Sequence, residues 1–342
     1  MSSAPWLESD VSLKALNTFG LPAHARRLAR IREDADVRRV LDSPEVGRAA
    51  KLVLGGGSNL VLTRDIDEVV LKVEVGGLRL VETRPDAFIV EDGAGLGWHD
   101  VVTETLERGW PGLENLALIP GTVGAAPIQN IGAYGVEIKD VLHKVTIMHA
   151  SSGIVYEMDS EACRFAYRDS IFKQADGCEL IVLEVTFALP AEWQPNLRYG
   201  ELAQAIAEQH LEAPTPQQVA DTVMAIRRRK LPDPAVIGNA GSFFKNPVVS
   251  HEQCAALLER FPALVHHAQP DGTEKLAAGW LIDQCGWKGR NLGPVGVYPK
   301  QALVLVNNGG ARGADITRLA EAIQDDVEAR YGVRLSPEPV FV

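Results

Sequence analysis

The sequence lacks the features that mark secreted, membrane-embedded and metal-binding proteins. Its four cysteines form no Cys-x-x-Cys pair, and their spacing to histidines predicts no metal site. We expect separate reduced thiols at Cys163, Cys178, Cys254 and Cys285. The first ten residues carry no basic patch followed by an apolar run, so no signal peptide is expected. No apolar stretch approaches the roughly 18 residues that span a bilayer, which predicts a cytoplasmic protein without a membrane partner.

An excess of basic residues is also missing. The chain has 34 Lys and Arg against 45 Asp and Glu, a net charge of −11. Nucleic-acid-binding proteins usually carry a basic face, so no nucleic-acid partner is expected. No internal repeat or low-complexity segment is found, and the 46% hydrophobic content is enough for the core of an ordinary globular protein. A length of 342 residues fits two or three domains.

Short β-type segments dominate the first two-thirds of the chain. Apolar or alternating runs, bounded by Gly, Pro and Asp, predict strands at 51–54, 69–73, 78–82, 88–91, 145–149, 154–156 and 180–189. Between them, helical patterns cover 34–41 and 99–108, the second ending at Gly109. The mixture predicts an α+β fold with mixed sheets, because strands and helices do not alternate regularly.

The composition changes after Leu189, where prolines and polar residues predict a connection between domains. Thr215 and Gln218 form a capping-box pattern that opens a helix through Ile226. A basic run at 227–230 follows, and prolines end the helix. Further on, the patterns predict helices near 252–260 and from Asp315 to Gly332, with strands at 302–307 and 334–342.

A run of three glycines, Gly55 to Gly57, follows the first predicted strand and precedes Ser58 and Asn59. Glycines let backbone N–H groups approach a phosphate closely. A dinucleotide fingerprint fails because Leu60 stands at the third glycine position and no helix follows. No Gly-Lys-Ser/Thr follows either, which excludes a P-loop. Taken alone, the run is as consistent with a tight turn as with a phosphate cradle.

A second segment, 119–135, is rich in small residues and amides. Small side chains allow a flat ring and a pyrophosphate to lie against the backbone. Gln129 and Asn130 offer donors and acceptors to the edge of a polar heterocycle. The segment is too polar for a core strand, and its composition is not that of a linker. It therefore favours a nucleotide-type cofactor site.

These two segments resemble the flavin-binding half of UDP-N-acetylenolpyruvoylglucosamine reductases. The resemblance extends over nearly the whole chain, in the same order, and several of its motifs are highly specific. The segment at Tyr199 and Gly200 is similar to the form of the family with a tyrosine-bearing substrate loop. The motifs that carry the resemblance are at 17–20, 55–59, 119–135, 165–172, 230–234, 238–247 and 277–283.

The resemblance implies a three-part α+β flavoenzyme. Its two-lobed FAD-binding region would be of the vanillyl-alcohol-oxidase-like type, followed by a C-terminal α+β substrate domain. The implied boundaries are 1–75 for the first lobe, 76–213 plus 332–342 for the second, and 214–331 for the substrate domain. The C-terminal strand would then return to the flavin region, and the UDP sugar would bind in a cleft between domains.

The implied activity is the NADPH-dependent reduction of UDP-N-acetylglucosamine enolpyruvate to UDP-N-acetylmuramate through non-covalent FAD. NADPH and the UDP sugar would occupy one site in turn. The reaction belongs to peptidoglycan precursor synthesis, and so to cell-wall biogenesis, cell shape, cell cycle and cell division. A monomer is expected.

Three residues match the family's catalytic positions. Ser242 would protonate the substrate carbon; taken alone, it is more typical of a turn serine that caps a backbone N–H. Arg168 would hold the enolate and carboxylate, where the alternative is a surface ion pair with Asp169. Glu338 would act with Arg168 around the enol, although a glutamate this close to a chain end is usually solvated.

The other matches are to binding positions. Substrate contacts are implied for Tyr167, Tyr199, Lys230, Asn246 and Gln301. In the basic run, Arg228 and Arg229 are expected to be solvated at a helix C-terminus. FAD contacts are implied for Asn17, Gly55, Gly56, Gly57, Ser58, Asn59, Pro120, Gly121, Gly124, Ala125, Ala126, Gln129, Asn130, Gly132, Ala133, Tyr134, Gly135 and Arg227.

Two departures from the family pattern bear on flavin contacts. Ala125 and Ala126 stand where some relatives carry hydroxyl residues, so backbone N–H groups would have to bond the flavin ring there. Val340 stands where a relative can place an arginine after the glutamate, which puts an extra cationic contact in doubt.

Two alternatives remain open. One is an FAD oxidase or dehydrogenase of the same fold group, several of which bind flavin covalently through His or Cys. Segment 119–135 contains neither residue, which favours non-covalent FAD. The other is a non-enzymatic nucleotide-sugar binding protein, against which the joint presence of Ser242, Arg168 and Glu338 argues.

Overall fold

The computed structural model describes residues 6–177 and 179–342. The chain forms two compact units, each built from several segments. Unit 1 comprises Met1–Val11, Ala25–Gly57 and Ile66–Arg229, and unit 2 comprises Ser12–His24, Ser58–Asp65 and Lys230–Val342. Within the described residues, no helix is long and apolar enough to cross a membrane. Cys163, Cys254 and Cys285 are free thiols, and Cys178 lies outside the described residues.

The first sheet of unit 1 has four strands in the order β1-β2-β5-β3. β2 and β3 each pair in parallel with β5, and α1 connects β2 to β3. Parallel strands are normally covered on both faces, and β5 accordingly buries five of its eight residues. The bounds are β1 Leu7–Ser12, β2 His24–Ile31, α1 Asp34–Leu41, β3 Lys51–Leu54 and β5 Ile66–Val73.

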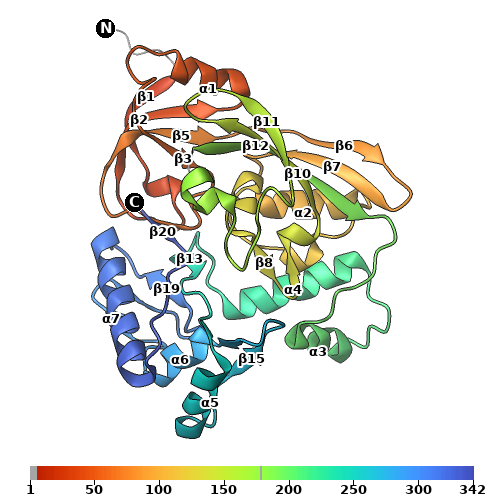
Figure 1. The fold of residues 1–342 in the computed structure, drawn as a ribbon, viewed down its shortest axis with the longest axis vertical. Helices are drawn as coiled ribbons and strands as arrows, with labels where there is room; N and C mark the ends of the chain where they lie inside the picture. Colours follow the sequence, from red (N-terminus) through yellow and green to blue (C-terminus); the bar gives the residue numbers. More distant parts are fainter. Residues whose placement is uncertain (1–5, 178) are drawn as a thin grey trace. The chain divides into compact units, whose positions relative to one another are not determined.

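The second sheet of unit 1 is antiparallel, in the order β11-β10-β12-β7-β6 (Figure 1). β12 is the longest strand and pairs with β10 on one side and β7 on the other. Gly153, at a φ of +68°, lies in the turn between β10 and β11. The bounds are β6 Leu78–Thr83, β7 Ala87–Gly93, β10 Leu142–His149, β11 Val155–Asp159 and β12 Leu180–Pro190.

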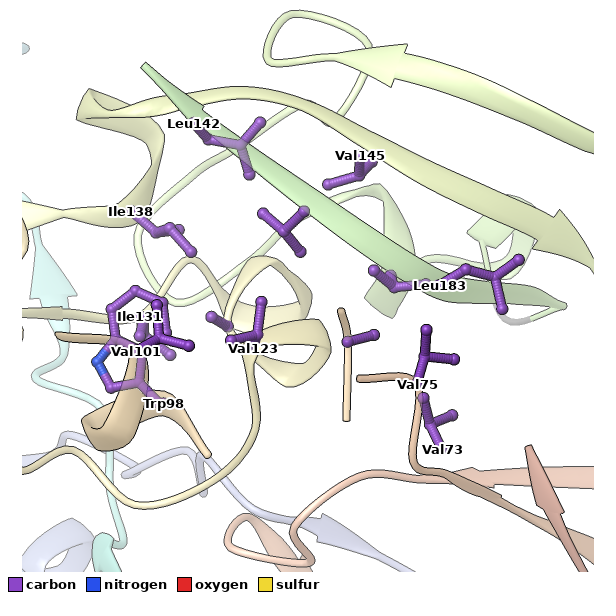
Figure 2. Close-up of a cluster of buried hydrophobic side chains, with 14 of the residues drawn as sticks. Val73, Val75, Trp98, Val101, Val123, Ile131, Ile138, Leu142, Val145 and Leu183 are labelled. Atoms are coloured by element: carbon purple, nitrogen blue, oxygen red, sulfur yellow. The ribbon is translucent and has the colours of Figure 1, made fainter. Parts of the chain in front are cut away.

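The core of unit 1 joins both sheets to α2, Trp98–Glu107. Val73 at the end of β5 and Val75 just after it belong to this core (Figure 2). Val145 and Leu183 contribute from the antiparallel sheet. Trp98 is fully buried, packs edge-on against Phe187 and donates its indole N–H to a backbone carbonyl. Such burial stabilises by about 1.5–3 kcal/mol per large side chain, so this core fixes the loops that surround it.

The remaining elements of unit 1 are short turns and two helices. α4, Pro216–Lys230, begins with the predicted capping box, because the Thr215 and Gln218 side chains each bond the other's backbone N–H. α3, Gly200–Glu208, lies in the segment for which the sequence predicts only a connection. The short strands β8, Gly132–Ala133, and β9, Val136–Glu137, form a hairpin within segment 119–140.

Unit 2 has two small antiparallel sheets, β13-β19-β18-β17 and β14-β16-β15, and the parallel pair β20-β4. The strands are β4 Leu60–Val61, β13 Gly238–Ser242, β14 Val248–Val249, β15 His266–Ala268, β16 Glu274–Leu276, β17 Asn291–Leu292, β18 Val295–Val297, β19 Val304–Asn307 and β20 Val340–Phe341. The helices are α5 His251–Arg260, α6 Ala278–Gln284 and α7 Gly313–Tyr331 (Figure 1).

Of two element ends predicted near the C-terminus, one is confirmed and one is wrong. α7 ends at Gly332, as predicted, in the left-handed conformation with a φ of +66°. The prediction of a strand over 334–342 is wrong in extent, because only Val340–Phe341 pairs as a strand, with β4. The α+β class is confirmed by the mixture of helices and sheets in both units.

Candidate active site

The glycine run of unit 1, Gly55 to Gly57, packs against the loop that begins at Gly121. A side chain at Gly56 would place its Cβ 2.9 Å from the Cα of Gly121, and one at Gly55 would lie 2.7 Å from the Thr122 hydroxyl. Both distances are below ordinary contact, so only glycine permits this approach. The turn after β3 and the loop at 121–125 therefore form two facing walls of bare backbone.

These walls carry hydrogen-bond donors without protein acceptors. In the described part of the chain, the N–H groups of Gly55, Gly56 and Gly57 donate to no protein atom. The buried hydroxyl of Thr122 has no partner either. Lys72, on β5, donates its ammonium to the Gly55 carbonyl at 2.8 Å. Buried polar groups are normally paired, so such a group of free donors suits an anionic ligand.

Backbone bonds to the start of α2 hold the second wall in place. Trp98 donates its N–H to the Gly121 carbonyl, and Val123 and Gly124 donate to Leu96 and Ala94. A Cβ on Gly124 would lie 2.5 Å from the Cβ of Ala94. The loop is thus positioned by main chain against main chain. Ala125 and Ala126 continue it in a short 3-10 turn.

Asn130 is fully buried and has a left-handed φ of +46°. Its amide N–H₂ donates to Glu137 and to the Ala166 carbonyl, and its amide oxygen accepts from Lys139. The side chain is therefore occupied inside the protein. A contact from Asn130 to a cofactor would have to use its backbone, and the predicted role stays a prediction.

Arg168 points its guanidinium at the same loop. It donates to the Gly132 carbonyl at 2.6 Å and to the Asn130 carbonyl at 3.4 Å, and lies 3.9 Å from Glu137. Its guanidinium also lies over the ring of Tyr167. The Asp169 carboxylate accepts from the N–H of Ser170 and from the side-chain amide of Gln174.

Tyr134, Tyr199 and Arg227 form a second group in unit 1. The two tyrosine rings pack edge-on with their centroids 5.2 Å apart, and Arg227 bonds the Tyr134 hydroxyl. Burial raises the pKa of Tyr134 to about 12 and lowers the pKa of Arg227. The Nε atom of Arg227 is buried and has no partner among the described residues. Tyr199 is 44% exposed.

Two asparagines that the sequence analysis missed hold this group together. Asn115 donates to the carbonyls of Tyr134 and Asn196, and Asn196 donates to Gly135. These bonds fasten the tyrosine-bearing segment to the end of the 119–135 loop. No sequence signal marks Asn115, because its partners are backbone carbonyls 19 and 81 residues away.

Unit 2 brings the backbone next to Ser242 and the segment around Glu338 together. Glu338 donates its backbone N–H to the carbonyl of Phe243 at 2.8 Å, and its own carbonyl accepts from the Asn59 amide. Phe243 is fully buried among Phe19, Phe244 and Phe341, which fixes the backbone next to Ser242. Ser242 itself is exposed at the end of β13, and Glu338 is 9% exposed.

The predicted substrate residues Asn246 and Gln301 meet at the start of α6. The Asn246 amide oxygen accepts the N–H of Ala278, and the Gln301 oxygen lies 3.4 Å from the Cβ position of Gly279. Lys230 is the last residue of α4. Asn17 uses its whole amide on Leu13 and Leu21, so it braces its own turn.

The residues of unit 1 fit a non-covalent dinucleotide cofactor such as FAD. Free N–H donors at the glycine run suit a diphosphate, and the unpartnered Thr122 hydroxyl and Arg227 Nε add polar contacts. The walls leave no space for side chains, so a planar group could lie directly on backbone. No cysteine or histidine lies within segment 119–135 to form a covalent link.

Two family models match the chain. Residues 25–159 match the FAD binding domain, and residues 233–342 match the C-terminal domain of UDP-N-acetylenolpyruvoylglucosamine reductase. The first match contains both glycine-lined walls, and the second contains Ser242, Asn246, Gln301 and Glu338. The FAD-binding architecture expected from the sequence is thereby confirmed.

Curated relatives align along the full length. A UDP-N-acetylenolpyruvoylglucosamine reductase of Azoarcus sp. strain BH72 is 58% identical and covers 100% of both chains. One of Ralstonia nicotianae is 55% identical over 98% of this chain and 99% of its own. Among solved structures, the crystal structure of the Thermus caldophilus reductase is 25% identical, with a TM-score of 0.69 over 98% of both chains.

Proposed function

The chain belongs to the UDP-N-acetylenolpyruvoylglucosamine reductase family, and from this we infer how its residues share the reaction. It is an FAD-containing oxidoreductase that reduces UDP-N-acetylglucosamine enolpyruvate to UDP-N-acetylmuramate in peptidoglycan synthesis. The observation that carries the assignment is full-length identity of 58%, joined to donor-lined backbone walls inside the FAD-binding match. The electron donor is NADPH, and we place the enzyme in the cytoplasm, as a monomer that serves cell division.

Bound FAD supplies the two-electron chemistry, so the protein has to supply position and electrostatics. We assign the diphosphate to the free N–H groups of the glycine run and the flavin ring to the wall at 121–126. The N–H groups of Ala125 and Ala126 donate to the carbonyls of Thr122 and Val123, so a substitute for the missing hydroxyls has to come from other backbone N–H groups. Tyr134 and Arg227 add polar contacts at the far end of the loop.

Reduction of the enolpyruvyl group leaves negative charge beside the substrate carboxylate. Arg168 is the cation assigned to that charge: its guanidinium is already oriented by the carbonyls of Gly132 and Asn130. A preorganised cation stabilises developing charge without reorganisation in the transition state. Glu137, at 3.9 Å, helps to hold the guanidinium in place.

Ser242 is assigned as the proton donor to the neighbouring carbon. A serine hydroxyl is a weak acid, so it acts only on a strongly basic carbon and in a fixed position. The buried ring of Phe243 and the backbone bond to Glu338 give that fixed position. Glu338 shares the site with Ser242, and its side chain is assigned to the enol.

The UDP sugar is assigned to Tyr167, Tyr199, Lys230, Asn246 and Gln301. Asn246 and Gln301 both lie beside the start of α6, where Asn246 accepts the N–H of Ala278. We keep the proposal that the chain has three functional parts. The two FAD-binding lobes are 1–75 and 76–213 with 332–342, and the substrate domain is 214–331. In that scheme NADPH and the UDP sugar occupy one site in turn.

An anaerobic visible spectrum tests the assignment. We expect flavin bands at about 370 and about 450 nm that bleach with NADPH and return with the enolpyruvyl UDP sugar. Bleaching without return would keep a flavin enzyme and discard the substrate. A colourless protein that stays colourless after FAD is added would contradict the cofactor site itself. Intersecting double-reciprocal plots would contradict the alternating use of one site.

A further inference from the structure

We propose that unit 2 carries a Zn²⁺ site formed by Cys254, His266 and Glu274, with His251 beside it. We call these four residues the Cys254 cluster. Among the described residues, the ligand atoms of Cys254, His266 and Glu274 all lie within 4.8 Å of one another. The proposal goes beyond the reductase activity and does not depend on it. It also departs from the sequence prediction that no metal site is present.

The fold places the four residues on facing surfaces of a helix and a hairpin. His251 and Cys254 are three residues apart in the first turn of α5, so both project from one face of the helix. Ser250 caps this helix by accepting the N–H of Gln253 at 3.1 Å. The helix start is therefore fixed, and with it the direction of both side chains.

The hairpin contributes the other two residues. In the register of β15 and β16, His266 lies opposite Leu276 and Ala268 lies opposite Glu274. His266 and Glu274 therefore occupy neighbouring positions on the same face, because side chains alternate between faces along a strand. Figure 1 shows β15 in the same part of unit 2 as α5. The ligands thus come from two elements joined by a short connection.

In the absence of a metal, hydrogen bonds join Glu274 to the two histidines. Glu274 lies 2.9 Å from Nδ1 of His266 and 3.2 Å from Nδ1 of His251, one carboxylate oxygen facing each ring. In a tetrahedral zinc site, bonds of 2.0–2.3 Å place ligand atoms about 3.3–3.7 Å apart. The ligand atoms of Cys254, His266 and Glu274, which all lie within 4.8 Å of one another, would adjust to these separations when the metal binds. His251 or a water molecule would take the fourth position.

The chemistry of the set favours zinc over magnesium or calcium. Thiolate, imidazole and carboxylate are the ligands that Zn²⁺ uses, whereas Mg²⁺ and Ca²⁺ take oxygen. Cys254 and Glu274 are 1% and 6% exposed, and the His251 side chain, 76% exposed, leaves a path for entry.

A metal here would fasten α5 to the hairpin next to the assigned substrate residue Asn246. β14 follows Asn246 after one residue and pairs with β16, which carries Glu274. Leu276 donates its N–H to the Pro247 carbonyl at 2.9 Å. The site is therefore structural: its ligands hold the segment that presents Asn246, and none of them belongs to the catalytic assignments above.

Metal titration of the tag-free FAD enzyme, after chelator treatment, tests the proposal. We expect one Zn²⁺ per chain with a Kd of about 1 µM or tighter, and release of about one proton from the thiol. Co²⁺ should give the intense d–d bands of a tetrahedral thiolate site, to the red of the flavin absorption. Weak octahedral Co²⁺ bands, or no stoichiometric Zn²⁺ binding, would overturn the proposal.

Matched variants locate the metal. Cys254→Ser should weaken Zn²⁺ binding by at least the roughly 100-fold that loss of even an outer-shell partner can cost, and should remove the proton release. Cys285→Ser, which changes the other described thiol of unit 2, should bind as the unchanged enzyme does. If Cys254→Ser binds Zn²⁺ equally well, the cluster is not the site. If that variant loses its flavin or fold, His266→Gln and the Co²⁺ spectrum of the unchanged enzyme decide.

Discussion

Asp92 is a buried carboxyl group whose ionisation should govern the stability of unit 1 near neutral pH. It lies on β7, between Leu78 of β6 and Val185 of β12, and is 0% exposed. Neither carboxylate oxygen has a hydrogen-bond partner among the described residues. Burial first, and then the charges of Glu104 and Glu91, raise its pKa from 3.8 to about 7. The charged form is thus strongly disfavoured in the folded protein.

The raised pKa makes folding less favourable as pH increases. Between 3.8 and about 7 the folded state keeps the proton that the unfolded state has released, so stability falls through this window. Each pH unit costs about 1.4 kcal/mol, which gives about 3 kcal/mol between pH 5 and pH 8 and about 4 kcal/mol in total. Asp92→Asn keeps the shape and removes the ionisation. The variant should therefore gain about 3 kcal/mol relative to the unchanged protein over that interval.

Urea unfolding at about pH 5 and about pH 8, with the same FAD concentration in every sample, measures this difference. The signal is tryptophan fluorescence, to which the buried Trp98 of the same core contributes. Asp86→Asn provides the matched control, since Asp86 is exposed in the turn that leads into β7. The control should shift little between the two pH values. An equal difference between Asp92→Asn and the unchanged protein at both pH values would refute the reasoning.

Three further predictions concern the reaction and its cofactor. Ser242→Ala should leave flavin reduction by NADPH nearly intact and slow reoxidation by the enolpyruvyl sugar by about 10²–10⁴-fold in stopped-flow experiments; equal loss in both half-reactions would remove the proton-donor assignment. Gly56→Ala should weaken FAD binding by about 5–150-fold, because its Cβ would lie 2.9 Å from Gly121. Gly76→Ala, whose Cβ meets nothing within 4 Å, should bind FAD normally, and equal flavin content in both would contradict the backbone-wall argument. Arg168→Lys should lower kcat/KM for the sugar by about 10-fold or more, since one ammonium cannot replace a guanidinium held by two carbonyls. An unchanged kcat/KM would exclude a role for the two guanidinium N–H bonds.

Local signals sufficed for elements whose ends are marked by side chains. The predicted bounds of β3 and α1 match the structure, and the capping box at Thr215 is formed as expected. The strand β13, Gly-Asn-Ala-Gly-Ser, has no β-branched or aromatic residue, and it exists because β19 pairs with it. The sequence analysis also missed α3 and the hairpin β15–β16, although the hairpin pairs residues only 6 to 10 positions apart.

Some parts of the candidate site could likewise be predicted from local sequence, and others could not. The glycine run and the 119–135 loop could be found from the sequence because a backbone wall requires small residues in unbroken order. The orientation of Arg168 could not: its partners are carbonyls 36 and 38 residues earlier. Spacing to neighbouring residues gave Asp169 as the alternative partner, whereas the left-handed backbone at Arg168, with a φ of +55°, turns the side chain to the loop. The Cys254 cluster was missed for a related reason, since its hairpin ligands lie 12 and 20 residues beyond Cys254.

An asparagine in a loop rich in small and polar residues need not contact a ligand with its side chain. Asn17 and Asn130 were predicted to contact FAD, yet both side-chain amides bond groups of their own unit. The loop uses its own backbone for much of its shape, because Val123, Gly124 and Ala125 all donate their N–H groups to backbone carbonyls, and amide side chains add bonds at its far end. Asn115 donates to the Tyr134 carbonyl and Asn196 to the Gly135 carbonyl, while Asn130 donates to Glu137 and to the Ala166 carbonyl. These side chains therefore brace the end of the loop, and the N–H groups of the Gly55–Gly57 run are left without a protein acceptor in the described part of the chain.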